Sequence, residues 1–124
     1  MKKFFSFAVV ALAAVSMFSF ASCKPAEKQI GLQLYSVNQD MSNVDASLAK
    51  VAEAGYTVVE TLGSPNCFGF PAAEFKALCD KHGLSIISIH TSIAMDPKNE
   101  AEVMNKWRAV FEGLKTMGAK YCVI

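Results

Sequence analysis

The feature that most constrains this chain is a regular alternation of short apolar stretches with amphipathic stretches that end in glycine. Short runs of β-branched and apolar residues bounded by turn residues are typical of strands. Apolar residues spaced three or four apart are typical of helices, and a glycine just past them is a common helix stop. The pattern predicts strands at 30–37, 56–63, 84–90 and 119–124, and helices at 43–55, 71–83 and 100–118.

The last of these helices shows the periodicity over the longest stretch. Its spacing predicts a buried stripe, and Gly118 follows directly as the stop. The members of this stripe are Val103, Trp107, Val110, Phe111 and Leu114.

Strands that alternate with helices of this length indicate βαβ units, and therefore an α/β protein with a parallel sheet. A doubly wound, flavodoxin-like sheet and a (β/α)8 TIM barrel both fit this order of elements. Alternate residues of a strand point to opposite faces, so the two faces of each strand are distinguished. The residues predicted to share the more polar face are Gln33 with Tyr35, Val58 with Glu60, and Ser88 with His90.

The opposite face stays apolar, as Ile87 and Ile89 of the third strand illustrate. A face that becomes polar toward the carboxyl ends of successive strands favours a barrel, because the barrel interior opens into a mouth at that end. The flavodoxin-like alternative calls for a phosphate-binding first loop, and residues 36–43 contain no glycine to form one. We therefore expect a barrel.

Gln33, Tyr35, Glu60 and His90 are the candidates for chemistry, because each lies at or near the carboxyl end of a predicted strand. A carboxylate and an imidazole that point into one mouth suit proton transfer or the binding of sugar hydroxyls. Each has a plainer alternative: Glu60 as a loop cap or lysine partner, and His90 as a histidine satisfied by a neighbouring carboxylate or carbonyl. Tyr35 is expected to form a wall on which a sugar can stack.

Other polar and aromatic residues receive structural interpretations. His82 is predicted to interact with the carboxyl end of its own helix, next to Gly83. The stretch 63–71 is rich in Gly and Pro, and it is either a lid over the mouth or a long connection whose phenylalanines contact something apolar. Cys67 and Cys79 are the one pair that could form a disulfide, and the alternative is that both remain thiols.

The amino terminus follows the plan of an export signal, with Lys2 and Lys3 before an apolar run. The sequence "FASC" at 20–23 is similar to a bacterial lipobox, so Cys23 is the expected site of cleavage and lipid attachment. An uncleaved anchor helix is the alternative. The expected organisation is a lipoprotein signal peptide at 1–22, a lipidated cysteine and tether at 23–29, and one domain at 30–124, held by its lipid in the cell envelope and facing the periplasm or cell surface.

The charge of the mature chain argues against nucleic-acid binding. Loss of Lys2 and Lys3 reduces the 12 basic residues to 10 against 11 acidic ones, which leaves a net charge of −1. Binding to nucleic acid requires clustered Lys or Arg. We therefore expect no nucleic-acid partner.

Four stretches together resemble the first four βα segments of the sugar phosphate isomerase/epimerase family, the xylose-isomerase-like TIM barrels, and most of all its exported lipoprotein members. They are "IGLQLYSV", "AGYTVVETLG", "AEFKALCDKHGLSIISIHTS" and "GAKYCVI". The resemblance implies the first four strands and three helices of a (β/α)8 barrel. It also implies isomerisation or epimerisation of small carbohydrates by proton transfer next to a carbonyl, whereas some relatives cleave or rearrange oxidised keto-sugars.

The resemblance also assigns residues and a cofactor. Glu60 and His90 match the glutamate and histidine at the ends of the second and third strands, as catalytic residues, and Gln33 and Tyr35 lie in the first-strand motif near the sugar. The family uses a divalent metal such as Mn²⁺, Mg²⁺, Co²⁺ or Zn²⁺, whose ligands come from later strands and are expected to be absent from residues 30–124. The chain is therefore expected to be inactive alone.

A chain with these four strands is expected to expose two sheet edges, through which it could self-associate or bind a partner. The competing interpretation is a non-catalytic, sugar- or partner-binding half-barrel lipoprotein. Free or oxidised sugars are favoured over phosphosugars, because no Arg or Lys cluster lies at the predicted mouth.

Overall fold

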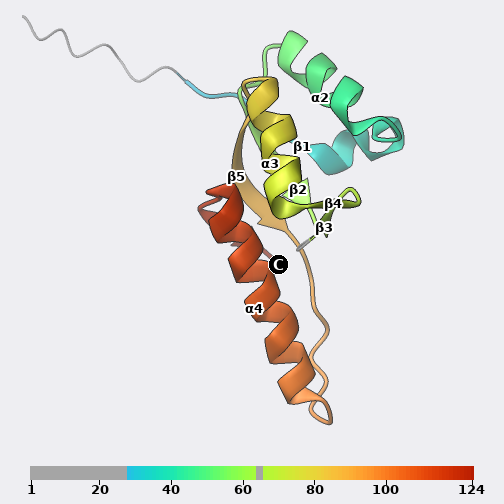
Figure 1. Ribbon diagram of the computed structural model, residues 1–124, viewed down its shortest axis with the longest axis vertical. Helices are drawn as coiled ribbons and strands as arrows, with labels where there is room; N and C mark the ends of the chain where they lie inside the picture. The colour runs from blue at the N-terminus through green and yellow to red at the C-terminus, as the bar shows by residue number, and fades with distance from the viewer. Residues whose placement is uncertain (1–27, 64–65) are drawn as a thin grey trace, which may run out of the picture.

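The structure is a computed structural model that describes residues 28–63 and 66–124. Four parallel strands form one sheet, with helices lying along one side of it (Figure 1). The predicted signal peptide and Cys23 lie outside the described residues, as does most of the tether. No helix within the described ranges is long and apolar enough to cross a membrane.

The sheet has the strand order of a barrel wall. The strands lie side by side in the order in which they occur along the chain, β1, β2, β5 and β6, and every adjacent pair is parallel. Within the described residues, β1 and β6 are the edge strands. The predicted α/β fold of parallel βα repeats is confirmed, and the sheet is not closed. The strands are β1 (Gly31–Gln33), β2 (Val58–Leu62), β5 (Ser85–His90) and β6 (Tyr121–Val123).

Three helices connect these strands: α2 (Val44–Glu53), α3 (Ala72–Lys81) and α4 (Glu100–Met117). The predicted stops and starts have local causes. The Asn43 side chain accepts a hydrogen bond of 3.1 Å from the Ala46 backbone N–H and so caps the start of α2. Gly118, with φ of 70°, ends α4 in the left-handed conformation that glycine adopts without strain.

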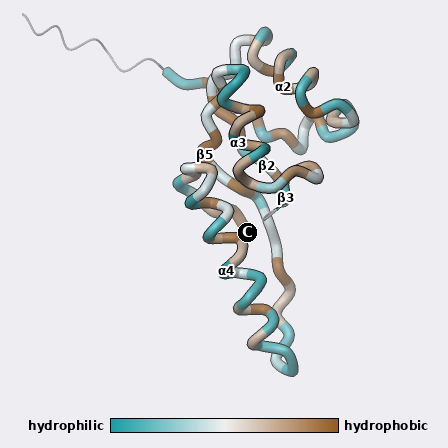
Figure 2. The backbone as a smooth tube through the Cα atoms, viewed as in Figure 1, coloured by the Kyte–Doolittle hydropathy of each residue, from teal (hydrophilic) through white to brown (hydrophobic). Residues whose placement is uncertain are grey.

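The hydrophobic core lies between the sheet and the helices. Val59 of β2 and Ile89 of β5 pack in it with Leu48, Phe75 and Val110, which come from the three helices. Hydrophilic and hydrophobic residues alternate along α4, as its amphipathic pattern predicts (Figure 2).

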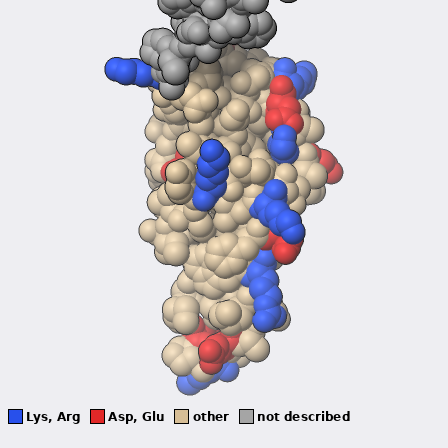
Figure 3. Space-filling model, turned by 90° about the vertical axis from the view of Figure 1, so that its left-hand side faces the viewer, with Lys and Arg blue, Asp and Glu red and all other residues tan. Residues whose placement is uncertain are grey.

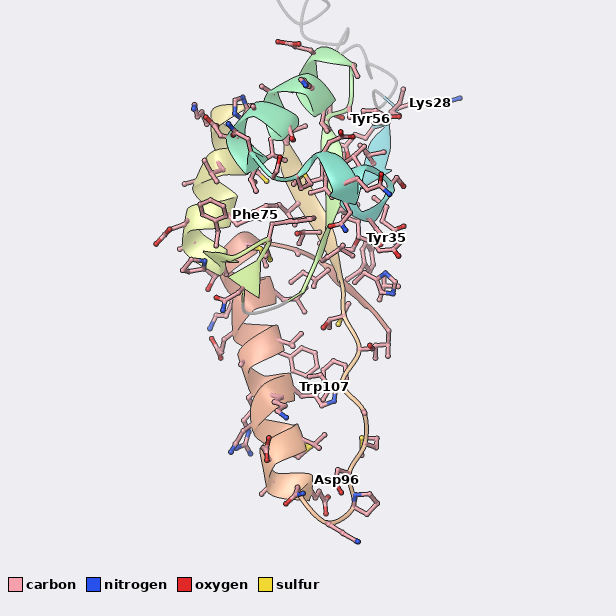
Figure 4. All side chains as sticks on the ribbon, turned by 90° about the vertical axis from the view of Figure 1, so that its right-hand side faces the viewer. Lys28, Tyr35, Tyr56, Phe75, Asp96 and Trp107 are labelled. Atoms are coloured by element: carbon pink, nitrogen blue, oxygen red, sulfur yellow. The ribbon has the colours of Figure 1, made fainter. Side chains whose placement is uncertain are left out.

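The predicted burial of one residue in the α4 stripe is wrong. Phe111 is 55% exposed, because it lies on the flank of the helix and stacks on Trp107 with ring centres 5.9 Å apart. Trp107 itself is partly buried against the core, and it projects from α4 toward the segment that follows β5 (Figure 4).

The first predicted strand is too long. β1 ends at Gln33, and a 3₁₀ segment, η1 (Leu34–Asp40), follows it with a kink at Val37. Leu34 turns into the core and is fully buried, so the chain leaves the sheet there and Tyr35 is 65% exposed. The prediction that Gln33 and Tyr35 share one face of one strand is therefore wrong.

A β-bulge changes the faces of β5. Val59 pairs with Ile86 but Glu60 pairs with Ser88, which leaves Ile87 as an extra residue. Ile86 and Ile89 are consequently buried, whereas Ile87 is 37% exposed, so the predicted shared face of Ile87 and Ile89 is wrong. The bulge also brings Ser88, rather than Ile87, beside Glu60.

The connection after β2 packs onto α3. Its described part forms a short antiparallel hairpin of β3 (Asn66–Cys67) and β4 (Phe70–Pro71). Cys67 is fully buried, and Phe68 stacks on Phe75 with ring centres 6.0 Å apart. These contacts favour the interpretation of residues 63–71 as a long connection packed on apolar residues, rather than as a lid over the mouth. Cys67 and Cys79 are free thiols, so the disulfide that their spacing allowed is not formed.

Candidate functional site

The candidate site lies on the face of the sheet that the helices leave uncovered. Gln33 of β1 is paired in register with Glu60 of β2, and Glu60 is paired with Ser88 of β5. Residues that are directly opposite in neighbouring strands project to the same face. We call Gln33, Glu60 and Ser88 the polar row.

The Glu60 carboxylate is held from both sides within the polar row. The Gln33 side-chain amide donates a hydrogen bond of 2.6 Å to Oε1, and the Ser88 hydroxyl donates one of 2.5 Å to Oε2. Hydrogen bonds to a carboxylate are stronger than those between neutral groups, so the two donors fix its orientation. Each oxygen retains a lone pair for a further donor, such as a sugar hydroxyl.

His90 joins the polar row through Gln33. The Gln33 Nε2 lies 3.4 Å from His90 Nδ1, a longer and weaker contact than those at Glu60. Because an amide nitrogen only donates, this contact suits a neutral imidazole that accepts at Nδ1 and carries its proton on Nε2. His90 then has an N–H donor at Nε2.

A shallow open hollow of about 360 Å³ lies beside these groups. Although Tyr35 is not in the strand, η1 brings it to the rim of this hollow, and Figure 4 shows it on the side of the sheet opposite to Phe75. The lining therefore combines hydroxyl, amide and imidazole groups with one aromatic ring and contains no Lys or Arg. The lining residues are Gln33, Tyr35, Leu62, Gly63, His90, Thr91 and Ser92.

The site therefore includes residues that the sequence did not single out. Ser88 was placed on the polar face with His90 but not recognised as a partner of Glu60, since the bulge that pairs them leaves no sequence signal. Thr91 and Ser92 follow β5 directly, and their position just past a strand end was the available clue.

The same residues offer few ligands for a metal ion. The described part of the chain holds no group of three or more His, Cys, Asp or Glu side chains that could bind a metal ion together. Glu60 and His90 are the two side chains of the site with suitable donor atoms, and a protein site for a divalent cation usually needs more. The described residues alone do not fit the divalent metal, which stays a prediction for a complete barrel.

His82 belongs to a separate cluster between α2 and α3. Its Nε2 lies 2.7 Å from Asp45 Oδ1, and Lys81 Nζ lies 2.7 Å from Asp45 Oδ2. The hydrogen bond from Lys81, followed by that from His82, lowers the pKa of the Asp45 carboxyl. His82 lies at the carboxyl end of α3, as predicted, and its ring additionally engages the Asp45 carboxylate of α2.

The buried cysteines are poor nucleophiles. Burial raises the pKa of the Cys79 thiol to about 12, and burial also raises the pKa of Cys67. The thiolate is the reactive form of cysteine. Neither residue is a candidate for covalent catalysis.

The face drawn in Figure 3 carries no patch of charged side chains of a single sign. Basic and acidic groups alternate along one flank, and much of the remaining surface in this view is uncharged. Nothing on this face resembles the basic stripe of a nucleic-acid-binding surface.

Comparisons with known proteins identify similar structures. No protein-family model and no curated protein matches the sequence. The crystal structure of a sugar phosphate isomerase/epimerase from Parabacteroides distasonis matches 77% of this chain with 31% identity and a TM-score of 0.65. A second sugar phosphate isomerase/epimerase structure from that organism matches 82% of the chain with 24% identity and a TM-score of 0.64.

The resemblance predicted from the sequence is confirmed for the part of the fold that the chain covers. The matched region is about 40% of the length of each of these structures, so the chain spans less than half of the proteins it resembles. An open sheet of four parallel strands agrees with that share of an eight-stranded barrel.

Proposed function

We propose, from the similarity to sugar phosphate isomerases/epimerases, that this chain supplies a sugar-binding wall of an enzyme that isomerises or epimerises small carbohydrates. The observation that supports this most is the Glu60 carboxylate, fixed by Gln33 and Ser88 and lying near His90 at the carboxyl end of the sheet. Active sites of (β/α)8 enzymes form at that end of the strands.

The proposed chemistry is a proton transfer at the carbon next to a sugar carbonyl. In the proton-transfer route to either product, a base removes this proton to give an enediol. A proton is then returned to the neighbouring carbon in isomerisation, or to the opposite face of the same carbon in epimerisation. Glu60 has the free lone pairs to accept a proton or to bind a hydroxyl, and the His90 Nε2–H can donate to a sugar oxygen. Gln33 links the two groups, so that they hold one orientation relative to each other.

We propose free or oxidised sugars as the substrate class. The hollow beside Glu60 is lined by neutral hydroxyl, amide and imidazole groups without Lys or Arg. Phosphate groups are usually bound by Arg, Lys or a helix amino terminus. The described wall therefore suits hydroxyl groups better than a phosphate.

A divalent metal is part of the proposal only for a complete barrel. It would polarise the carbonyl or hydroxyl oxygens of the sugar. The described residues hold no metal-binding cluster, so we expect residues 1–124 alone to bind sugars without converting them. The same observation favours a second candidate function, which is sugar binding without turnover.

The cellular setting of the proposal is the cell envelope. The apolar run that ends at Cys23 supports a lipid anchor, which would place the domain in the periplasm or at the cell surface. Association with a second copy or another chain through the free edges of β1 and β6 stays a prediction.

Solvent-deuterium exchange tests the enzyme directly. The complete barrel that contains this chain, isolated from the cells that produce it, is incubated in D₂O with free aldoses and ketoses and with their phosphates. Deuterium at the carbon next to the carbonyl is then measured. We expect exchange with free or oxidised sugars, and a loss of about 100-fold or more in Glu60→Gln, as is typical of removing an acid–base group. The matched control is Glu74→Gln, at an exposed carboxylate in the first turn of α3.

Three results would revise the proposal in different ways. Exchange of phosphorylated sugars alone would reject the substrate class. Unchanged activity in Glu60→Gln would reject the role of this carboxylate. Sugar binding without deuterium exchange, when each of the divalent metals is added in turn, would favour the second candidate function, sugar binding without turnover.

A further inference from the structure

We propose that Tyr121 is a further substrate-contacting residue, which extends the polar row to the fourth strand and stacks on a single unphosphorylated sugar. This inference rests on the proposed function. Its starting point is the register of the sheet, in which Ser88 of β5 pairs directly with Tyr121 of β6. Gln33, Glu60, Ser88 and Tyr121 therefore form one continuous line across all four strands.

Tyr121 lies on the uncovered face and is free to contact a ligand. Its side chain is 60% exposed and does not belong to the core cluster. The next residue, Cys122, points the other way and packs against that core. The ring of Tyr121 is therefore not required for packing the helices onto the sheet.

The chemistry of Tyr121 complements that of the polar row. It is the one Phe, Tyr or Trp within the four strands β1, β2, β5 and β6. A tyrosine ring offers a large rigid apolar surface for the C–H face of a sugar, and its hydroxyl can donate and accept. Glu60 would then bind sugar hydroxyls while the ring of Tyr121 packs on the apolar face of the same sugar.

The spacing suits one monosaccharide. Neighbouring strands lie about 4.8 Å apart, so the backbones at Glu60 and Tyr121, two strands apart, are separated by roughly 10 Å. Ser88, which lies between them, is only 5% exposed, so the side chains around it already cover it. A sugar lying across this part of the sheet would therefore contact the outer atoms of Glu60 and Tyr121, whereas two sugars side by side would not fit.

Calorimetric titration of the full chain tests this inference. D-fructose and D-xylose are the probes, and the one that binds the unmodified chain more tightly is used for the variants. We expect Tyr121→Ala to weaken its binding about tenfold and Tyr121→Phe, which keeps the ring, to change it less than threefold. Lys120→Ala, on the exposed residue just before Tyr121, is the matched control and should bind as the unmodified chain does. Thermal unfolding of each variant reports whether the fold is retained.

The outcomes separate this inference from the proposed function. Weaker binding in Tyr121→Ala with an unchanged unfolding midpoint supports the inference. Weaker binding in Glu60→Gln together with unchanged binding in Tyr121→Ala would overturn the role of Tyr121 and leave the proposed function standing. A fall in the unfolding midpoint of Tyr121→Ala that matches its loss of binding would assign the residue a structural role instead. Absence of binding by both sugars to the unmodified chain would overturn both proposals.

Discussion

The two faces of the sheet differ although they are built from the same strands. In β2, Val59 packs against the helices while Glu60, the next residue, lies on the uncovered face and binds Gln33 and Ser88. In β5, Ile89 is fully buried while His90 lies at the open hollow. The covered face therefore holds the fold together, and the uncovered face carries the polar groups that can bind a ligand. Substitutions on the two faces should have separable effects.

The largest expected effect comes from the covered face. Phe75→Ala removes a fully buried ring that also stacks on Phe68, which should lower the free energy of unfolding by about 3–5 kcal/mol. Small domains are stable by only about 5–15 kcal/mol, so much of this chain should unfold. Val123→Ala, at the edge of the uncovered face, should cost less than about 1 kcal/mol. Urea unfolding followed by circular dichroism measures both, and equal losses would contradict the division between faces.

The next effect tests the uncovered face. Ser88→Ala removes the donor to Glu60 Oε2, which should free the carboxylate to rotate and weaken sugar binding about tenfold, or roughly 1.4 kcal/mol. Ser85→Ala is the matched control, because Ser85 is an exposed serine at the start of the same strand. Titration calorimetry gives both affinities. If the two variants bind sugar equally well, the hydrogen bond from Ser88 does not position Glu60.

A smaller effect concerns alkaline pH and the covered face. Burial raises the pKa of Cys79 from 9.0 to about 12, so the folded chain holds this proton more tightly than the unfolded chain does. The stability that this group contributes is complete below pH 9 and is lost as the pH rises toward 12. Cys79→Ala should therefore show a shallower fall in unfolding free energy between pH 9 and 11 than the unmodified chain. Identical slopes would show that the thiol is not protected from solvent.

The smallest effect is expected at the helix surface. The pKa of Asp45 is lowered, mainly by Lys81, so its contribution to stability is present above pH 3.8 and is lost as the pH falls below that value. Asp45→Asn should lower the unfolding midpoint slightly at pH 6, and this difference should disappear in acid and shrink in high salt. A difference that persists at pH 2 would point to a packing role for this residue.

The sequence predicted the order and type of the main elements because periodicity and glycine stops are local signals. The helix that ends at Gly118, the strand that contains Glu60 and the strand that contains Ile89 all follow from such patterns. The sequence could not predict that β1 stops at Gln33, since the burial of Leu34 depends on packing from elsewhere in the chain. The bulge at Ile87 was hidden for the same reason, because it is a property of pairing between strands.

The candidate site was predictable in part. Glu60, His90 and Gln33 were identified from their positions at strand ends, and the structure brings these three together. Tyr35 reaches the hollow by a different route, through η1 rather than through the strand. The pairing of Ser88 with Glu60 and with Tyr121 could be recognised only from the register of β5 with its two neighbours.

The most direct test of the central claim is to map where a sugar binds on the folded chain. The ¹⁵N-labelled full chain is titrated with D-fructose or D-xylose, and the amide signals that shift are assigned. The account predicts that the largest shifts fall at the carboxyl ends of β1, β2 and β5, around Gln33, Glu60 and His90. Shifts confined to the helices, or to the amino-terminal ends of the strands, would contradict the assignment of the uncovered face as the binding site.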